Sequence, residues 1–128
     1  MKHIVILQQP YFNMVLNGTK TIESRFAVNK IAPFEKVQIG DELLIKETGK
    51  AVTAKAIVKA VKYYILTPEL VEELRVKYGK AIGTDLPADW VNTKTKRYGT
   101  LIWVENVHQV DPINVPRSNG AGWICIND

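Results

Sequence analysis

Three ionised side chains, Lys20, Glu23 and Arg25, fall within six residues of the chain. If this segment is a strand, alternation places Glu23 and Arg25 on the same face. A carboxylate beside a guanidinium forms a bidentate pair that fixes the planar fork of the arginine. A lysine that joins such a pair leaves a positive excess, which suits a phosphate, a carboxylate or a polarised carbonyl group.

Two points about this group stay open in the sequence. Lys20 falls on the opposite face of the strand from Glu23, unless a bulge beside Gly18 turns it round. The three charges could also be an exposed ion pair with a solvated lysine, which contributes little to stability. Spacing alone favours this second interpretation, because charge networks are often purely structural.

The elements that position these residues follow from periodicity and from turn residues. β-Branched and alternating segments predict strands over residues 3–8, 19–26, 43–47, 52–64, 98–110 and 122–126. Proline and capping residues predict helices over residues 10–18 and 67–79 and a shorter one within 84–95. Gly18 and Gly79 are expected to end the first two helices, and Asp111-Pro112 the fifth strand. Five or six strands with two or three helices predict one α+β domain over residues 1–128, most simply a small curved sheet or barrel.

The pattern Gly18-x-Lys20-x-x-Glu23-x-Arg25 resembles the signature of the ASCH domain, a module named for its homology to a transcriptional coactivator. Flanking segments are also similar to that family, namely Gln9-Pro10-Tyr11, Val15-Leu16-Asn17-Gly18 and the turn Ile39-Gly40-Asp41. Near the C-terminus, Pro116-Arg117 and Gly122-Trp123 resemble the closing loop and strand of some members. The likeness is strong over residues 8–45 and weak over 112–126.

The resemblance implies a fold like the pseudouridine synthase and archaeosine transglycosylase (PUA) domain, a small β-barrel with two or three helices packed against it. It also implies that the chain binds nucleic acid, with RNA preferred, and holds a base or a phosphate in a cleft. Lys20, Glu23 and Arg25 would line the cleft, with further contacts from Gln9, Tyr11 and Arg117. The cations would meet a phosphate or a base carbonyl, the carboxylate would orient Arg25 or accept from an exocyclic amine, and the tyrosine would stack on a base.

A hydrolase is the alternative function, because some members to which the chain is similar are enzymes. Bacterial acetylcytidine amidohydrolases resemble the chain at Lys20, but they carry a threonine nucleophile where Glu23 stands. Their catalytic glutamate follows the long strand, in a region that here holds Glu69, Glu72 and Glu73, and the sequence does not choose among these. Lys20 and Glu23 would instead form an acid/base pair acting on a modified nucleoside or, in a ribonuclease, on RNA.

The region from 84 to 97 holds two weaker candidates. Trp90 would cover the mouth of the cleft. The basic cluster of Lys94, Lys96 and Arg97 would be a second phosphate contact if it folds near Lys20, although a solvated loop is the simpler interpretation.

Composition limits the remaining classes of function. The net charge is +4, and residues 1–64 hold ten Lys and Arg against five Asp and Glu, which permits a polyanionic partner. With one cysteine and two histidines, neither an intramolecular disulfide nor a Cys/His zinc site is expected, and no cofactor is predicted. No apolar run approaches the ~20 residues of a membrane helix, and no signal-peptide pattern opens the chain. We therefore expect a cytoplasmic protein without a membrane partner, whose oligomeric state stays open.

Overall fold

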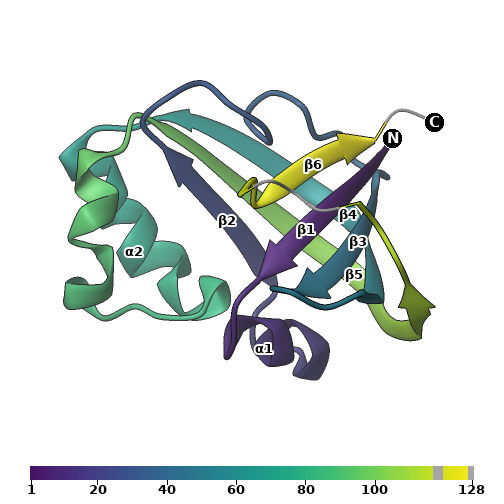
Figure 1. Ribbon diagram of the computed structural model, residues 1–128. Coiled ribbons are helices and arrows are strands. Elements are labelled where there is room, and N and C mark those ends of the chain that lie inside the picture. The colour runs from purple at the N-terminus through teal and green to yellow at the C-terminus, as the bar shows by residue number, and fades with distance from the viewer. Residues whose placement is uncertain (117–119, 127–128) are drawn as a thin grey trace.

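The framework of the molecule is one curled sheet with the strand order β2-β5-β4-β3-β1-β6 (Figure 1). The computed structural model describes residues 1–116 and 120–126. The strands are β1 (Lys2–Leu7), β2 (Ile22–Ala27), β3 (Glu42–Glu47), β4 (Val52–Ile65), β5 (Tyr98–Ile113) and β6 (Trp123–Ile126). β1 is parallel to β3, and the other neighbouring pairs are antiparallel. This mixed half-barrel with helices beside it confirms the predicted α+β class.

The two longest strands curl the sheet. β4 has 14 residues and β5 has 16, and their pairing shifts register at three places. Such bulges increase the local twist of a strand pair. Along β4 the small apolar residues are buried as the alternation predicts, from Val52 through Ala54 and Ala56 to Val58. The last shift, between Val58 and Ala60, ends that pattern.

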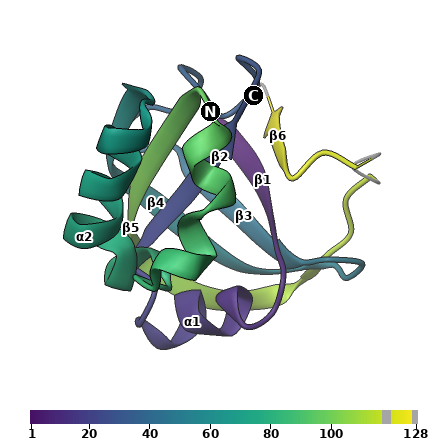
Figure 2. The ribbon, with the colours of Figure 1, turned by 90° about the vertical axis from the view of Figure 1, so that its left-hand side faces the viewer.

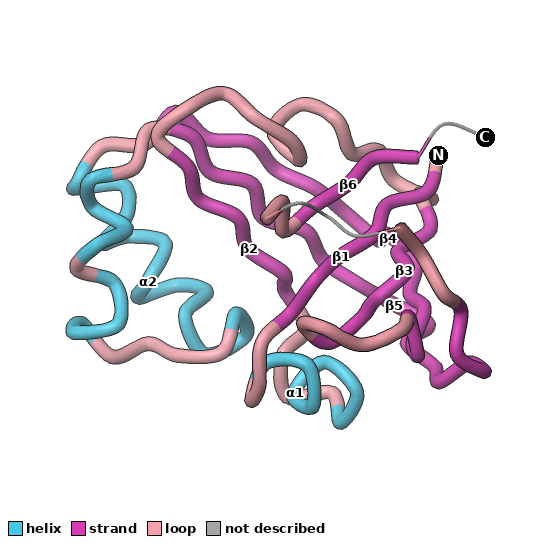
Figure 3. The backbone as a smooth tube through the Cα atoms, in the orientation of Figure 1, coloured by secondary structure: helices cyan, strands magenta, loops and turns pink. Residues whose placement is uncertain are grey.

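Helices cover one side and one end of the sheet, as Figure 3 shows in cyan. The helix α1 (Tyr11–Asn17) ends at Gly18, whose φ of 84° is in the left-handed region that glycine adopts at little cost. The helix α2 (Pro68–Ile82) begins at Thr67, whose side chain accepts a hydrogen bond from the Leu70 N–H. Two 3₁₀-helices, η1 (Pro87–Trp90) and η2 (Asn92–Thr95), follow α2 and pack with it beside β2 (Figure 2).

Three predicted boundaries are wrong by more than one residue. α2 continues through Gly79 to Ile82. The glycine is needed there for packing and does not end the helix, since a Cβ at this position would lie 2.8 Å from the Cα of Asp85. β5 continues past Pro112 to Ile113, which pairs with Val52 where the register shifts, so the ladder does not need the missing proline N–H. β2 begins only at Ile22, which leaves Lys20 in the loop that precedes the strand.

Buried apolar clusters fill the inside of the curl and the space under α2. The first contains Val5, Phe12, Leu43 and Trp123, and the second joins Ile22, Leu101 and Trp90 to the inner face of α2. Among the residues that the structure describes, no helix is both long and apolar enough to cross a membrane.

One buried polar network closes the sheet where β1, β3 and β6 meet. His3 is fully buried, its Nε2 lies 2.8 Å from Oδ2 of Asp41, and its Nδ1 accepts a hydrogen bond from the Trp123 indole N–H at 3.1 Å. Since Nδ1 is an acceptor, the proton of the neutral ring is on Nε2 and is donated to Asp41. This network attaches β6 to the rest of the sheet.

Candidate functional site

A cleft of about 650 Å³ opens between β2, the end of β1, the two 3₁₀-helices and the loop that leads into β6. Side chains from both halves of the sequence line it, including Tyr11, Lys20, Glu23, Arg25, Trp90 and Lys96. The three residues of the charged group therefore do meet in one cleft. Lys20 lies in the loop after Gly18 and reaches the cleft from there, on the same side as Glu23. This settles the point about Lys20 that the sequence left open.

Lys20 is a buried cation on the wall of the cleft. Its side chain is only 4% exposed, and its ammonium donates to the carbonyl oxygens of Ile22 and Ile82. The ammonium also lies 5.7 Å from the centre of the Tyr11 ring, in the position of a cation–π contact. Burial lowers the pKa of Lys20 below its usual 10.5; the nearby carboxylate of Glu23 opposes this shift, and the guanidinium of Arg25 adds to it.

Glu23 presents an acceptor that no described group uses. The residue is 6% exposed; its Oε1 accepts from the Ser24 N–H at 2.9 Å and lies 3.8 Å from the ammonium of Lys20. Its other oxygen, Oε2, is buried with no hydrogen-bond partner among the described residues. Leaving a buried acceptor of this kind unpaired costs about 1–3 kcal/mol, and more when the group is charged. A ligand donor that reached Oε2 would remove that cost.

Arg25 is held across the cleft by backbone groups. Its two terminal nitrogens donate to the carbonyl oxygens of Ile6, at 3.0 Å, and of Gly122, at 3.1 Å. Nε lies 3.6 Å from Oε1 of Glu23, so the expected bidentate pair with that carboxylate is not formed. The side chain thus links β2 to β1 and to the loop before β6.

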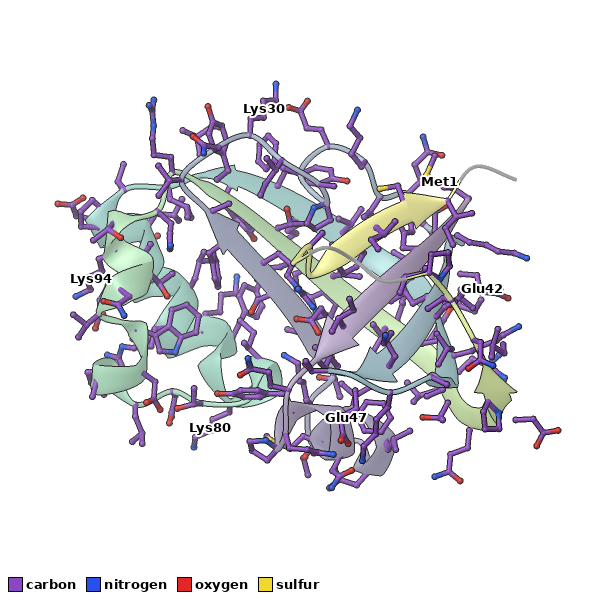
Figure 4. The ribbon with its side chains drawn as sticks, in the orientation of Figure 1. Met1, Lys30, Glu42, Glu47, Lys80 and Lys94 are labelled. Atoms are coloured by element: carbon purple, nitrogen blue, oxygen red, sulfur yellow. The ribbon has the colours of Figure 1, made fainter. Side chains whose placement is uncertain are left out.

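The other expected contacts divide between the cleft and the outer surface. Tyr11 is 37% exposed and lines the cleft, where its ring packs so closely on Gly83 that a Cβ there would lie 2.9 Å from it. Gln9 lies outside the cleft lining and donates to Glu47, which Figure 4 labels beside α1. Arg117 lies outside the described residues.

None of the three candidate glutamates on α2 is among the described residues that line the cleft. Glu69 and Glu73 are exposed, and Glu72 pairs with Arg75 and with Lys94. Lys94 is thereby drawn to the outer side of the helices (Figure 4). The acid that pairs with Lys20 in the described part of the chain is instead Glu23.

The segment from 84 to 96 supplies the wall that faces β2. Trp90 is 3% exposed, lines the cleft, and contacts the Phe26 ring edge-on with 5.6 Å between the ring centres. Its indole N–H donates to the carbonyl oxygen of Thr84 at 2.8 Å, which fixes the ring. Lys96 also lines the cleft, whereas Lys94 and Arg97 do not. The sequence indicated Trp90 and Lys96 only as weaker candidates. They are distant from Lys20 in sequence, and only the folding of α2 and the 3₁₀-helices brings them to the site.

The electrostatics of the cleft are close to balanced. Its described lining holds the cations Lys20, Arg25 and Lys96 and the anions Glu23 and Asp89, so one positive charge is left over. Within residues 1–116 and 120–126, no group of three His, Cys, Asp or Glu side chains is arranged to hold a metal ion. The site can therefore offer a donor, an acceptor and aromatic surface to one ligand.

Comparison with known proteins places the chain in a family. The model of the ASCH domain matches residues 5–114. Among solved structures, the crystal structure of ASCH from Zymomonas mobilis superposes with a TM-score of 0.72 at 16% identity, covering 98% of this chain and 87% of that one. A mutant of the Zymomonas mobilis protein gives 0.73 at 15% identity, covering 98% and 88%.

The hypothetical protein PH0355 gives a TM-score of 0.58 at 21% identity, covering 86% of this chain and 100% of that one. At these identities the likenesses show the fold. No curated protein matches the chain in sequence. Since the family model spans most of the chain and the solved structures share its half-barrel, the protein belongs to the ASCH domain family.

Proposed function

We propose that the protein binds nucleic acid, with RNA preferred, and holds one unpaired base in the cleft between Lys20, Glu23 and Tyr11. The observation that carries this proposal is that Glu23 lines the cleft and that its buried Oε2 has no hydrogen-bond partner among the described residues. The ammonium of Lys20 lies 3.8 Å from the other oxygen of the same carboxylate, Oε1, so a donor group and an acceptor group are neighbours. The edge of a nucleobase offers the complementary arrangement, with amino or imino hydrogens next to carbonyl or ring acceptors.

A base fits the interior of the cleft better than a bare phosphate does. Two hydrogens of the Lys20 ammonium already serve carbonyl oxygens, and the free oxygen of Glu23 repels an anion. The exposed ring of Tyr11 gives a base a surface on which to stack. Lys96, which is only partly buried on the same lining, is available to the phosphate that follows the base.

The preference for RNA rests on how a base would enter the cleft. Only an unpaired base can be enclosed in this way, and sequence-specific RNA recognition mostly uses unpaired bases in loops, bulges and ends. An RNA partner also agrees with the basic excess of residues 1–64 and with the cytoplasmic location expected from the sequence.

Fluorescence anisotropy with a labelled single-stranded RNA of mixed sequence tests this function. We expect saturable binding that weakens as salt rises, because the RNA backbone releases counterions when the protein binds. Lys20→Met should weaken binding at least tenfold. Lys80→Met is the matched control, because Lys80 is exposed at the outer edge of α2 and outside the cleft (Figure 4). Equal affinities in the two variants, with both folded by circular dichroism, would rule out the cleft as the binding site.

A hydrolase remains the second candidate, and one observation favours it. Burial lowers the pKa of Lys20, so its ammonium gives up a proton more readily, and a carboxylate lies 3.8 Å away. Glu23 would take a proton from water while Lys20 gives one to the leaving group. Incubation with acylated nucleosides and with labelled RNA tests this function. Release of products that Glu23→Gln abolishes would support it, and the absence of any product would exclude it.

A further inference from the structure

A second, smaller pocket of about 170 Å³ lies beside the cleft, on the side of Arg25 that faces the loop after β2. Arg25, Phe26 and Gly122 belong to the linings of both spaces, so the two lie next to each other on either side of the arginine side chain. The smaller space, which we call the ring pocket, is also lined by Ala27, Ala32, Phe34, Tyr98 and Trp123.

Arg25 forms a fixed partition between the cleft and the ring pocket. Two backbone carbonyl oxygens accept from its terminal nitrogens, and its guanidinium carbon lies 5.4 Å from the centre of the Trp123 ring. Gly122 leaves room for it, since a Cβ at that position would lie 2.6 Å from Nη1. Because the partition is already ordered, a ligand does not need to immobilise it on binding.

The walls of the ring pocket suit a flat, uncharged ring. Aromatic side chains surround it, and Phe34 packs edge-on against Tyr98 with 5.0 Å between the ring centres. Of the described residues in its lining, only Arg25 carries a charge, and a guanidinium plane is a good stacking surface for a base. The volume fits one ring, since an apolar cavity of about 150 Å³ takes up benzene.

We propose that the ring pocket binds the base adjacent in sequence to the base held in the cleft, so that the site recognises a dinucleotide. This inference rests on the proposed function. The second base of the same strand is the occupant because the pocket adjoins the cleft, with the Arg25 side chain lining both spaces. The pocket has about a quarter of the volume of the cleft, so it accepts the base while its sugar and phosphate stay outside.

Isothermal titration calorimetry with ribonucleoside monophosphates and with ribodinucleotides tests the proposal. The best dinucleotide should bind about tenfold more tightly than either of its mononucleotides, which is the scale of stacking one base on an aromatic surface. Ala27 and Ala32 line the ring pocket and not the cleft, so Ala27→Leu and Ala32→Leu are chosen to fill the ring pocket. Both variants should reduce dinucleotide affinity to the mononucleotide level and leave mononucleotide affinity unchanged.

Val28→Leu is the matched control, because Val28 follows Ala27, is 49% exposed and lines neither space. Its affinities for mononucleotides and for dinucleotides should equal those of the native protein. If mononucleotides bind but dinucleotides bind no more tightly, or if both filling variants keep the advantage, the ring pocket is not a base site and the proposed function stands. If neither ligand binds, the proposed function fails, and this inference fails with it.

Discussion

The ammonium of Lys20 and the carboxylate of Glu23 face each other across 3.8 Å on the wall of the cleft, and both side chains are almost completely buried. Neither neutralises the other through a direct hydrogen bond: the lysine donates to two carbonyl oxygens, and the carboxylate accepts from the Ser24 N–H. Burying two charges without a close pair is costly for stability. A binding site that needs a donor beside an acceptor gives a reason to retain such an arrangement.

The depressed pKa of Lys20 predicts a stability that changes with alkaline pH. Between its folded pKa and the usual 10.5, the unfolded chain binds the extra proton, so stability rises with pH across that window. Lys20→Met removes this contribution. We expect urea unfolding between about pH 7 and about pH 10 to show that the free energy of unfolding of the native protein increases relative to that of the variant as pH rises. A constant difference between the two would contradict the burial of a charged lysine.

The contact between Arg25 and Gly122 predicts a coupled pair of mutations. Gly122→Ala puts a Cβ 2.6 Å from Nη1 of Arg25, so we expect a loss of about 1–3 kcal/mol of unfolding free energy. In an Arg25→Ala background the same change should cost much less, because the clash is gone. Urea denaturation of the four proteins measures the coupling. Additive effects of the two mutations would show that Gly122 is required for another reason.

Asp41 predicts a sensitivity to acid at the junction of β1, β3 and β6. Burial alone raises its pKa, but hydrogen bonds from His3, from the Gln38 N–H and from the N-terminal amine outweigh that effect and leave it below its usual 3.8. The stability that Asp41 contributes is therefore present above pH 3.8 and is lost as pH falls through the folded pKa. Asp41→Asn keeps one acceptor for His3 and removes the charge.

The free energies of unfolding of the native protein and Asp41→Asn should differ by about 1–3 kcal/mol near neutral pH. They should converge on acidification. Urea denaturation at neutral pH and at about pH 3 makes the comparison. A deficit of the same size at both pH values would mean that the charge of Asp41 contributes nothing.

We predict that replacing Gly79 by alanine, a better helix former, will destabilise the protein. Alanine is ordinarily about 1 kcal/mol more favourable than glycine inside a helix. Here its Cβ would lie 2.8 Å from the Cα of Asp85, so Gly79→Ala should lower the melting temperature. Lys80→Ala, at the exposed neighbouring position of the same helix, should leave it almost unchanged. A Gly79→Ala protein as stable as the native one would mean that the loop at Asp85 moves without cost.

Local sequence signals predicted most elements of this fold. The threonine cap and Pro68 located the start of α2, and β-branched alternation located β4, because capping and side-chain period act over a few residues. The errors at Gly79 and Pro112 have a different origin. In each case a contact outside the element overrides the local tendency of the residue to end it: Gly79 packs against Asp85 in the turn after α2, and Ile113 pairs with Val52 of β4.

The candidate site could be predicted only in part. The spacing of Lys20, Glu23 and Arg25, with the family resemblance, identified one wall of the cleft. Local sequence could not show that Arg25 donates to the carbonyl oxygens of Ile6 and Gly122, since β1 and the loop before β6 reach it only in the folded protein. Trp90 faces the same cleft for a similar reason: α2 and the turn after it must first pack against β2.

The affinity of Glu23→Gln for single-stranded RNA tests the central claim most directly, with Glu35→Gln as the control on an exposed glutamate outside the cleft. If Oε2 accepts a hydrogen bond from a base, Glu23→Gln should weaken binding about tenfold or more, while Glu35→Gln binds as the native protein does. If the cleft instead takes only phosphate, removing the negative charge should strengthen binding. Affinity that is unchanged or higher in Glu23→Gln would contradict the proposal that Glu23 recognises a base.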